Sequence, residues 1–230
     1  MLHYYNVNIT LKDDINKPAS VLYEGKSIPL DTYLARTTAA EIGTGSPIEA
    51  LKAQAVAAYT FAKLNNFKVV SSQQAYSSVF DAEKASNIKT AVAEVAGKYL
   101  SYNGAVASTP YFAQSAGKTV SAESVWGSDK YPYLEGGVYS PEVVTPTNAT
   151  FTTDEIRDLV EKYNNKSISK DDITLSGNPS DWFEIVKADD AGYVEIIRVG
   201  DQTMSGNTFR YYLLESGIRS HCFIFSYNSK

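Results

Sequence analysis

An alanine-rich stretch from Ala50 to Ala58 constrains the fold more than any other part of this sequence. It follows Ser46, Pro47 and Glu49, the pattern of a capping box with proline at the first helical position, where a missing N–H costs nothing. Small and apolar residues then recur at helical spacing, so we predict a helix over 47–65. Its small side chains allow another element to pack closely against it.

A second helix is predicted immediately upstream, over 31–42, with Asp31 as its N-cap and Gly43 as its stop. Glu41 falls in the last turn of this helix, where the negative end of the helix dipole disfavours an ionised carboxylate by roughly 0.3–1 kcal/mol. Burial against the alanine-rich helix would act in the same direction, as a general acid working near neutral pH requires. Glu41 is therefore a candidate acid, and the alternative is a solvated surface carboxylate.

The rest of the chain alternates short strands and helices. Strands are expected at 5–10, 20–29, about 98–113, 182–187, 194–199 and 208–214, and further helices at 82–96 and 153–162. This order predicts an α+β fold with mixed helices and mainly antiparallel strands. Glycine and proline residues mark 136–150 as a long surface connection. We therefore expect a single domain over residues 1–230 that can divide near 136–150 into two lobes around a cleft.

The composition narrows the classes of partner. The chain has a net charge of −5, which argues against nucleic acid. Its 17 tyrosines and 2 tryptophans suit sugar binding, although tyrosine is equally at home in strands. The apolar runs are far shorter than the ~18 residues of a membrane span, and no signal peptide is visible.

Metal and nucleophile chemistry have little support in the sequence. His3, His221 and Cys222 are the only imidazole and thiol groups, so we expect no metal and no cofactor. Ser115 lies in a Gln-Ser-Ala-Gly segment, but no histidine stands in a motif that would serve it as a base. Its hydroxyl is expected to bond to the backbone or to a sugar. The neighbours His221 and Cys222 are interpreted as strand packing.

Several motifs occur in an order that resembles one family. They are Ile28-Pro-Leu-Asp-Thr-Tyr-Leu34, Ala40-Glu-Ile42, the Ala50–Ala58 run, Gln74-Ala-Tyr76, Tyr111-Phe-Ala-Gln-Ser-Ala-Gly-Lys-Thr119, Ser124-Val-Trp-Gly127 and Ile218-Arg-Ser220. In this order they are similar to the motifs of the stage II sporulation protein D family of bacterial cell-wall enzymes. The Ala50–Ala58 run is the more specific of them, whereas the Ser-x-Gly-x-Thr piece is weak alone.

The resemblance implies a lytic transglycosylase that cleaves peptidoglycan glycan strands between N-acetylmuramic acid and N-acetylglucosamine and leaves 1,6-anhydromuramoyl ends. Glu41 would act as both acid and base. One carboxylate suffices because the muramoyl 6-hydroxyl, rather than water, closes the ring. Asp81, Glu83 and Asp129 stay open as a second carboxylate. The residues expected to contact substrate are Lys52, Gln54, Tyr59, Gln74, Tyr76, Ser115, Gly117, Thr119 and Trp126.

The alternative function is a non-catalytic peptidoglycan-binding module or amidase enhancer, with a cell-wall amidase or other sporulation proteins as partners. Two departures from the family pattern bear on this choice. Tyr59 stands where relatives usually carry arginine, and the chain ends at Lys230 before a Gly-His-Gly-Val-Gly-Met-Ser-Gln segment. We therefore expect a chain truncated at its C-terminus. The resemblance also implies an extracytoplasmic location, at the cell wall or membrane, reached through a leader absent from this sequence.

Overall fold

The computed structural model describes residues 8–77, 86–140, 145–166 and 171–229. It divides into two compact units, unit 1 over Met1–Ala113 and unit 2 over Gln114–Lys230. The boundary therefore lies upstream of the 136–150 segment at which a division was expected. Residues 141–144 of that segment lie outside the described residues. No helix in the described ranges is both long enough and apolar enough to span a membrane.

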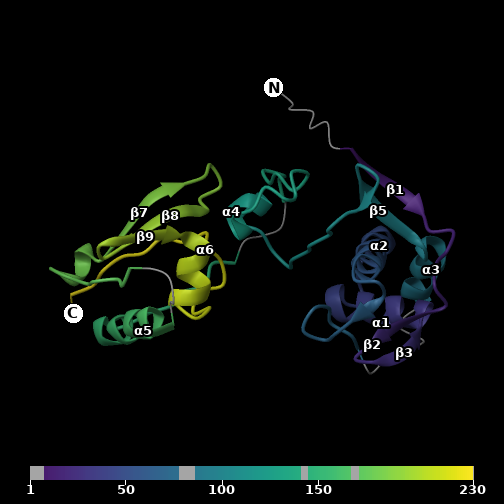
Figure 1. The fold of residues 1–230 in the computed structure, drawn as a ribbon, viewed down its shortest axis with the longest axis horizontal. Helices are drawn as coiled ribbons and strands as arrows, with labels where there is room; N and C mark the ends of the chain where they lie inside the picture. Colours follow the sequence, from purple (N-terminus) through teal and green to yellow (C-terminus); the bar gives the residue numbers. More distant parts are fainter. Residues whose placement is uncertain (1–7, 78–85, 141–144, 167–170, 230) are drawn as a thin grey trace. The chain divides into compact units, whose positions relative to one another are not determined.

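Within its described residues, unit 1 contains two small sheets and three helices, which Figure 1 labels. One sheet has the order β1-β5-β6 and is antiparallel; the other has the order β3-β2-β4, with β2 antiparallel to β3 and parallel to β4. The elements are β1 (Ile9–Asp13), β2 (Ser20–Tyr23), β3 (Lys26–Pro29), α1 (Leu30–Ile42), α2 (Ile48–Leu64), β4 (Lys68–Val69), α3 (Ser86–Val95), β5 (Lys98–Tyr102) and β6 (Ala105–Val106).

Helix α2 is the centre of unit 1, because it packs against α1, α3 and β5. Its residues Ala55, Ala58 and Ala62 are fully buried, and a methyl side chain at each position lets the neighbouring backbones approach. The core around α2 also includes the fully buried Tyr33 and Leu51. The predicted close packing of the alanine-rich helix is confirmed.

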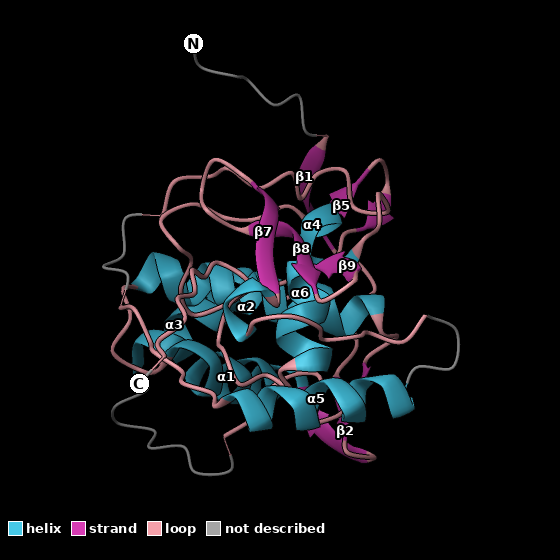
Figure 2. Ribbon diagram, turned by 90° about the vertical axis from the view of Figure 1, so that its left-hand side faces the viewer, coloured by secondary structure: helices cyan, strands magenta, loops and turns pink. Residues whose placement is uncertain are grey.

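Unit 2 places helical segments against one antiparallel sheet of order β7-β8-β9. Both ribbon views place α6 between this sheet and α5 (Figures 1 and 2). The buried residues Ile156, Trp182, Ile197 and Leu213 belong to its core. The elements are α4 (Ala122–Trp126), α5 (Thr153–Lys166), the 3₁₀ turn η1 (Pro179–Asp181), β7 (Phe183–Ala188), β8 (Val194–Val199), β9 (Gln202–Ser205), α6 (Gly206–Thr208) and the π-helix η2 (Phe209–Leu213).

Most of the predicted elements are present, and the α+β class with mainly antiparallel sheets is confirmed. The strand expected at 208–214 is wrong. Ser205 caps a helical segment there, and Leu214 N–H donates to the carbonyl of Phe209, the five-residue spacing of a π-helix. The starts of the strand predicted over 5–10 and of the helix predicted over 82–96 lie outside the described residues.

The start of α2 differs in detail from a capping box. Pro47 is the N-cap residue and no side chain caps the helix. The Ser46 hydroxyl instead donates to the carbonyl of Ile42, 2.8 Å away, and so closes the turn between α1 and α2. Glu49 pairs with Lys52 rather than reaching back to the backbone of Ser46.

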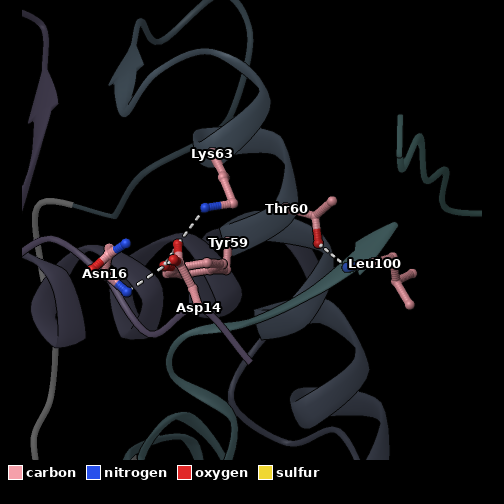
Figure 3. A network of polar contacts seen from close by, with 6 residues as sticks. All are labelled: Asp14, Asn16, Tyr59, Thr60, Lys63 and Leu100. Atoms are coloured by element: carbon pink, nitrogen blue, oxygen red, sulfur yellow. Dashed lines mark hydrogen bonds and ion pairs between the residues drawn. The ribbon is translucent and has the colours of Figure 1, made fainter. Parts of the chain in front are cut away.

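A buried carboxylate joins the loop after β1 to the C-terminal half of α2 (Figure 3). Asp14 Oδ2 accepts hydrogen bonds from the Tyr59 hydroxyl at 2.7 Å and from Lys63 Nζ at 2.5 Å, and Oδ1 accepts from Asn16 N–H at 3.2 Å. One turn of α2 also meets β5, where Thr60 Oγ1 accepts from Leu100 N–H at 3.1 Å. Burial alone would raise the pKa of Asp14, but the hydrogen bonds from Lys63 and Tyr59 outweigh it and the pKa is lowered.

We expect Asp14→Ala to lower the free energy of unfolding by about 2–3 kcal/mol near neutral pH, because Tyr59 and Lys63 lose a charged acceptor. The pKa of Asp14 is lower in the folded state, so this stabilisation is complete above the ordinary value of 3.8 and is lost as pH falls through the folded value. Urea unfolding at neutral pH and at about pH 3 measures both effects.

The matched control is Asp13→Ala, which removes an exposed ion pair with Lys98 and should cost less than ~0.5 kcal/mol. An Asp14→Ala effect of equal size at both pH values would contradict the assignment of the stabilisation to the ionised carboxylate.

Candidate functional site

Glu41 lies in the last turn of α1, and a backbone N–H fixes its carboxylate. The helix ends at Gly43, whose φ of +77° is a left-handed conformation that favours glycine. Glu41 is half-buried, and its Oε1 accepts a hydrogen bond from Ala75 N–H at 2.7 Å. The predicted position of this residue at a helix end is confirmed, and its contact with the Gln74-Ala75-Tyr76 segment brings two predicted site regions together.

Gln74 anchors that segment. Its side chain is 2% exposed, and Oε1 accepts from the Tyr33 hydroxyl while Nε2 donates to the Tyr111 hydroxyl at 3.2 Å. Its backbone carbonyl accepts from the Tyr23 hydroxyl, also at 3.2 Å. A helix, a strand and the loop residue Tyr111 therefore hold Gln74, and the adjacent Ala75 N–H is thereby aimed at Glu41.

Tyr111 completes the surroundings of the carboxylate. Burial raises the pKa of Tyr111 to about 12; the Glu41 carboxylate, through its charge and as a hydrogen-bond acceptor, adds to the rise, and the amides of Gln74 and Gln54 oppose it. The phenol is therefore protonated near neutral pH. Because 36% of the residue is exposed, its hydroxyl can serve as a donor beside Glu41 in a place that a ligand can reach.

Gln54 faces the same place from α2. It is 7% exposed, and its Nε2 has no hydrogen-bond partner of good geometry among the described residues. The amide is nevertheless close enough to the Tyr111 hydroxyl to oppose the rise of the Tyr111 pKa, so Gln54 and Tyr111 lie together beside Glu41.

Tyr76 and Arg36 form the flank of this site. The Tyr76 ring stacks on Tyr23 with centroids 4.7 Å apart and lies 6.5 Å from Tyr33. The Arg36 guanidinium lies 5.6 Å from the Tyr76 ring centroid, a cation–π arrangement. The predicted site residues Glu41, Gln54, Gln74 and Tyr76 thus cluster in unit 1.

Two other predicted residues of unit 1 lie elsewhere. Lys52 Nζ forms ion pairs with Glu49 at 2.8 Å and with Glu94 of α3 at 2.6 Å. It precedes Gln54 by two residues, about 200° around the helix, and so occupies a different face of α2. Tyr59 is fully buried in the core with its hydroxyl on Asp14, which corrects the expectation of a substrate contact there.

The remaining predicted residues belong to unit 2. Gly117 and Thr119 lie in a turn that pairs with 137–140, through Ser140 N–H to Gly117 O at 3.0 Å and Thr119 N–H to Val138 O at 2.9 Å. The Tyr193 hydroxyl fastens this turn by accepting from Ala116 N–H and donating to Lys118 O. Ser115, at its start, is 5% exposed.

Trp126 ends the short helix α4 and is 50% exposed, with its ring against Tyr131 at a centroid distance of 5.8 Å. Asp129, an alternative carboxylate, also lies in unit 2 and is exposed. The other two alternatives, Asp81 and Glu83, fall outside the described residues. Within the described part of the chain, no group of three or more His, Cys, Asp or Glu side chains is placed to hold a metal ion.

The sequence pattern does not single out Tyr111, Tyr33 or Tyr23. Tyr111 is the first residue of the Tyr111–Thr119 motif, and that position is the signal that the sequence offers for it. Tyr33 and Tyr23 look in sequence like ordinary core residues of a helix and a strand. Their hydroxyls matter because both are bonded to Gln74, a contact between segments distant in the chain.

Comparison with known proteins bears on this site directly. Residues 21–102, which include Glu41, Gln54 and Gln74, match the family model described as Stage II sporulation protein. The chain is 29% identical over 168 residues to the amidase enhancer of Bacillus subtilis (strain 168), covering 70% of this chain and 23% of that protein. It is 32% identical over 138 residues to stage II sporulation protein D of Bacillus amyloliquefaciens, covering 50% and 40%. These alignments span less than half of each relative.

We expect Gln74→Ala to lower the free energy of unfolding by about 2–4 kcal/mol, because the buried Tyr33 hydroxyl loses its acceptor and a cavity forms. The Ala75 amide should also exchange its hydrogen about tenfold faster, since the segment that carries it is no longer anchored. Urea unfolding and amide hydrogen exchange measure the two effects.

Gln73→Ala is the control, because Gln73 is exposed and its side chain accepts a long bond, from Val70 N–H at 3.3 Å. It should change stability by less than ~0.5 kcal/mol. Equal effects of the two substitutions would show that Gln74 does not anchor the segment.

Proposed function

We propose that this chain, which matches the stage II sporulation protein family model over residues 21–102, acts in the cell wall by cleaving the glycan strands of peptidoglycan as a lytic transglycosylase, with Glu41 as acid and base. The observation that carries this proposal is the setting of the Glu41 carboxylate. It is half-buried, held by Ala75 N–H and flanked by a protonated Tyr111. The proposed location is outside the cytoplasm, where peptidoglycan lies.

The proposed reaction has two proton transfers at one carboxyl group. Protonated Glu41 gives its proton to the oxygen that links N-acetylmuramic acid to the next N-acetylglucosamine, and the bond from that oxygen to the muramoyl C1 breaks. The muramoyl 6-hydroxyl then bonds to C1, and the Glu41 carboxylate takes the hydroxyl proton. The product is a 1,6-anhydro ring, water is not consumed, and the carboxyl group returns to its starting state.

The neighbours of Glu41 have separate parts in this proposal. Ala75 N–H holds Oε1, and the other carboxylate oxygen would exchange the proton with the sugar. Tyr111 and the buried amide of Gln54 would donate hydrogen bonds to substrate oxygens beside the carboxylate. In this arrangement Tyr111 would contact the substrate directly, with its phenol protonated near neutral pH.

A second candidate function is the enhancement of a cell-wall amidase without glycan cleavage. Two observations favour it: the amidase enhancer of Bacillus subtilis is among the relatives, and the position expected to hold an arginine contains Tyr59, which is buried on Asp14. Tyr59 therefore offers no cation to a substrate carboxylate.

We expect Glu41→Gln to abolish the release of 1,6-anhydromuramoyl products from peptide-free glycan strands, a loss of at least about a thousandfold, because glutamine cannot transfer the proton. Mass spectrometry of the digest measures it. The control is Asp31→Asn, an exposed carboxylate in the first turn of the same helix, which should digest the strands at the wild-type rate.

Wild-type protein that binds the strands and yields no anhydro products would refute the cleavage proposal. The enhancer function is then tested by adding the chain to a purified cell-wall amidase acting on whole peptidoglycan. Stimulation of equal size by wild type and Glu41→Gln would support enhancement as the role of the chain.

We expect Tyr111→Phe to lower kcat by about ten- to a hundredfold and to change KM by less than about threefold, because it removes one donor beside the reacting carboxyl group and leaves the ring in place. Steady-state cleavage of glycan strands measures the two constants. Tyr227→Phe, at an exposed tyrosine of unit 2, is the control. A change confined to KM would instead make Tyr111 a general binding residue.

A further inference from the structure

Unit 2 contains a pocket whose lining residues are all different from those of the Glu41 site. Its volume is about 480 Å³, within the range of roughly 300–1,000 Å³ that is typical of small-ligand sites. Tyr163 and Lys166 of α5 contribute to its wall, together with Thr208, Tyr211, Tyr212 and the turn that follows η2.

The π-helix η2 supplies two exposed aromatic rings to this pocket. Tyr211 is 55% exposed and Tyr212 is 62% exposed, and their ring centroids lie 5.0 Å apart at an interplanar angle of 77°. Phe209 and Leu213 of the same segment are buried in the core and fix the backbone between them. Exposed, nearly perpendicular rings on a fixed backbone present aromatic faces to a ligand at little cost in conformational entropy.

A fixed carboxylate lies beside the rings. Glu215 Oε2 pairs with Lys162 Nζ at 2.6 Å and Oε1 with Lys166 Nζ at 2.8 Å, and these two bonds lower the pKa of Glu215 to about 2. The carboxylate is therefore ionised near neutral pH and held in one orientation. A carboxylate has about four acceptor positions, so each oxygen can still accept from a ligand hydroxyl.

The turn after η2 is strained. Glu215 has φ of +49° and Ser216 has φ of +63°, a left-handed conformation that is unfavourable for a residue other than glycine. Ser216 N–H to Arg210 O at 2.9 Å and Gly217 N–H to Leu214 O at 2.7 Å hold this turn closed. Strain of this kind concentrates at ligand sites, and here it places Glu215 and Ser216 at the pocket.

We propose that this pocket is a saccharide-binding site in which the rings of Tyr211 and Tyr212 contact the apolar face of a sugar and Glu215 and Thr208 bond to its hydroxyl groups. The mixture of aromatic faces with hydroxyl and carboxylate acceptors suits a ligand that is apolar on one face and rich in hydroxyls at its edge. The choice of a glycan built from N-acetylated hexosamines rests on the function proposed above. Unit 2 would then hold a strand independently of Glu41.

The test is a titration of the 230-residue chain with tetra-N-acetylchitotetraose and with peptide-free peptidoglycan strands. We expect backbone NMR shifts at Tyr211, Tyr212 and Ser216 for both ligands. Tyr211→Ala/Tyr212→Ala should weaken binding at this site by about ten- to a hundredfold. Tyr211→Phe/Tyr212→Phe should stay within about threefold of wild type, because the rings remain.

Tyr227→Ala is the matched control for loss of an exposed tyrosine in unit 2, and it should bind like wild type. Glu41→Gln should also leave the NMR shifts at Tyr211, Tyr212 and Ser216 unchanged. A loss of cleavage at Glu41 can thus be distinguished from a loss of saccharide binding in unit 2. The proposal would be overturned if neither saccharide produced the shifts, or if the double alanine variant bound as tightly as wild type. Either result would favour a pocket that contacts a protein partner instead.

Discussion

The arrangement around Glu41 depends on one buried amide side chain, that of Gln74. The Gln74 side chain accepts from a tyrosine of α1 and donates to Tyr111, while the backbone carbonyl of Gln74 accepts from a tyrosine of β2. Gln74 itself is buried, where an unmade hydrogen bond is costly. The backbone N–H that bonds to Glu41 belongs to the next residue, Ala75. The hydrogen bonds of Gln74 therefore position the donor that orients the Glu41 carboxylate.

Local signals in the sequence predicted the frame of this site well. The Ala50–Ala58 run and Gly43 fix the ends of α2 and α1 to within a residue or two, and they place Glu41 in the last turn of α1. The partners of Glu41 could not be read in the same way. Ala75 lies 34 residues further along the chain, and the Gln74 bond to Tyr111 joins residues 37 apart. Such contacts follow from tertiary packing, which periodicity does not encode.

Two predictions failed for physical reasons that single residues illustrate. Tyr59 was expected to contact substrate because it replaces a cation, but α2 packs against α1, α3 and β5 and has little free surface at that position. The alternating pattern of 208–214 predicts a strand. The same seven residues also fit a helix, whose buried positions are Phe209, Leu213 and Leu214, and the structure forms that helix. In both cases the segment is packed on more than one side, whereas the sequence pattern was interpreted as if only one face were buried.

The bond between Tyr59 and Asp14 has a consequence for how this chain can change. An arginine at position 59 would bring a second cation to a carboxylate that already pairs with Lys63, in a place where the Asp14 side chain is 6% exposed. That surplus charge would be poorly solvated and would displace the loop after β1. Introducing at position 59 the arginine that the family resemblance implies would therefore require compensating changes around Asp14 and Lys63. The tyrosine at this position is fixed by the charges of its neighbours.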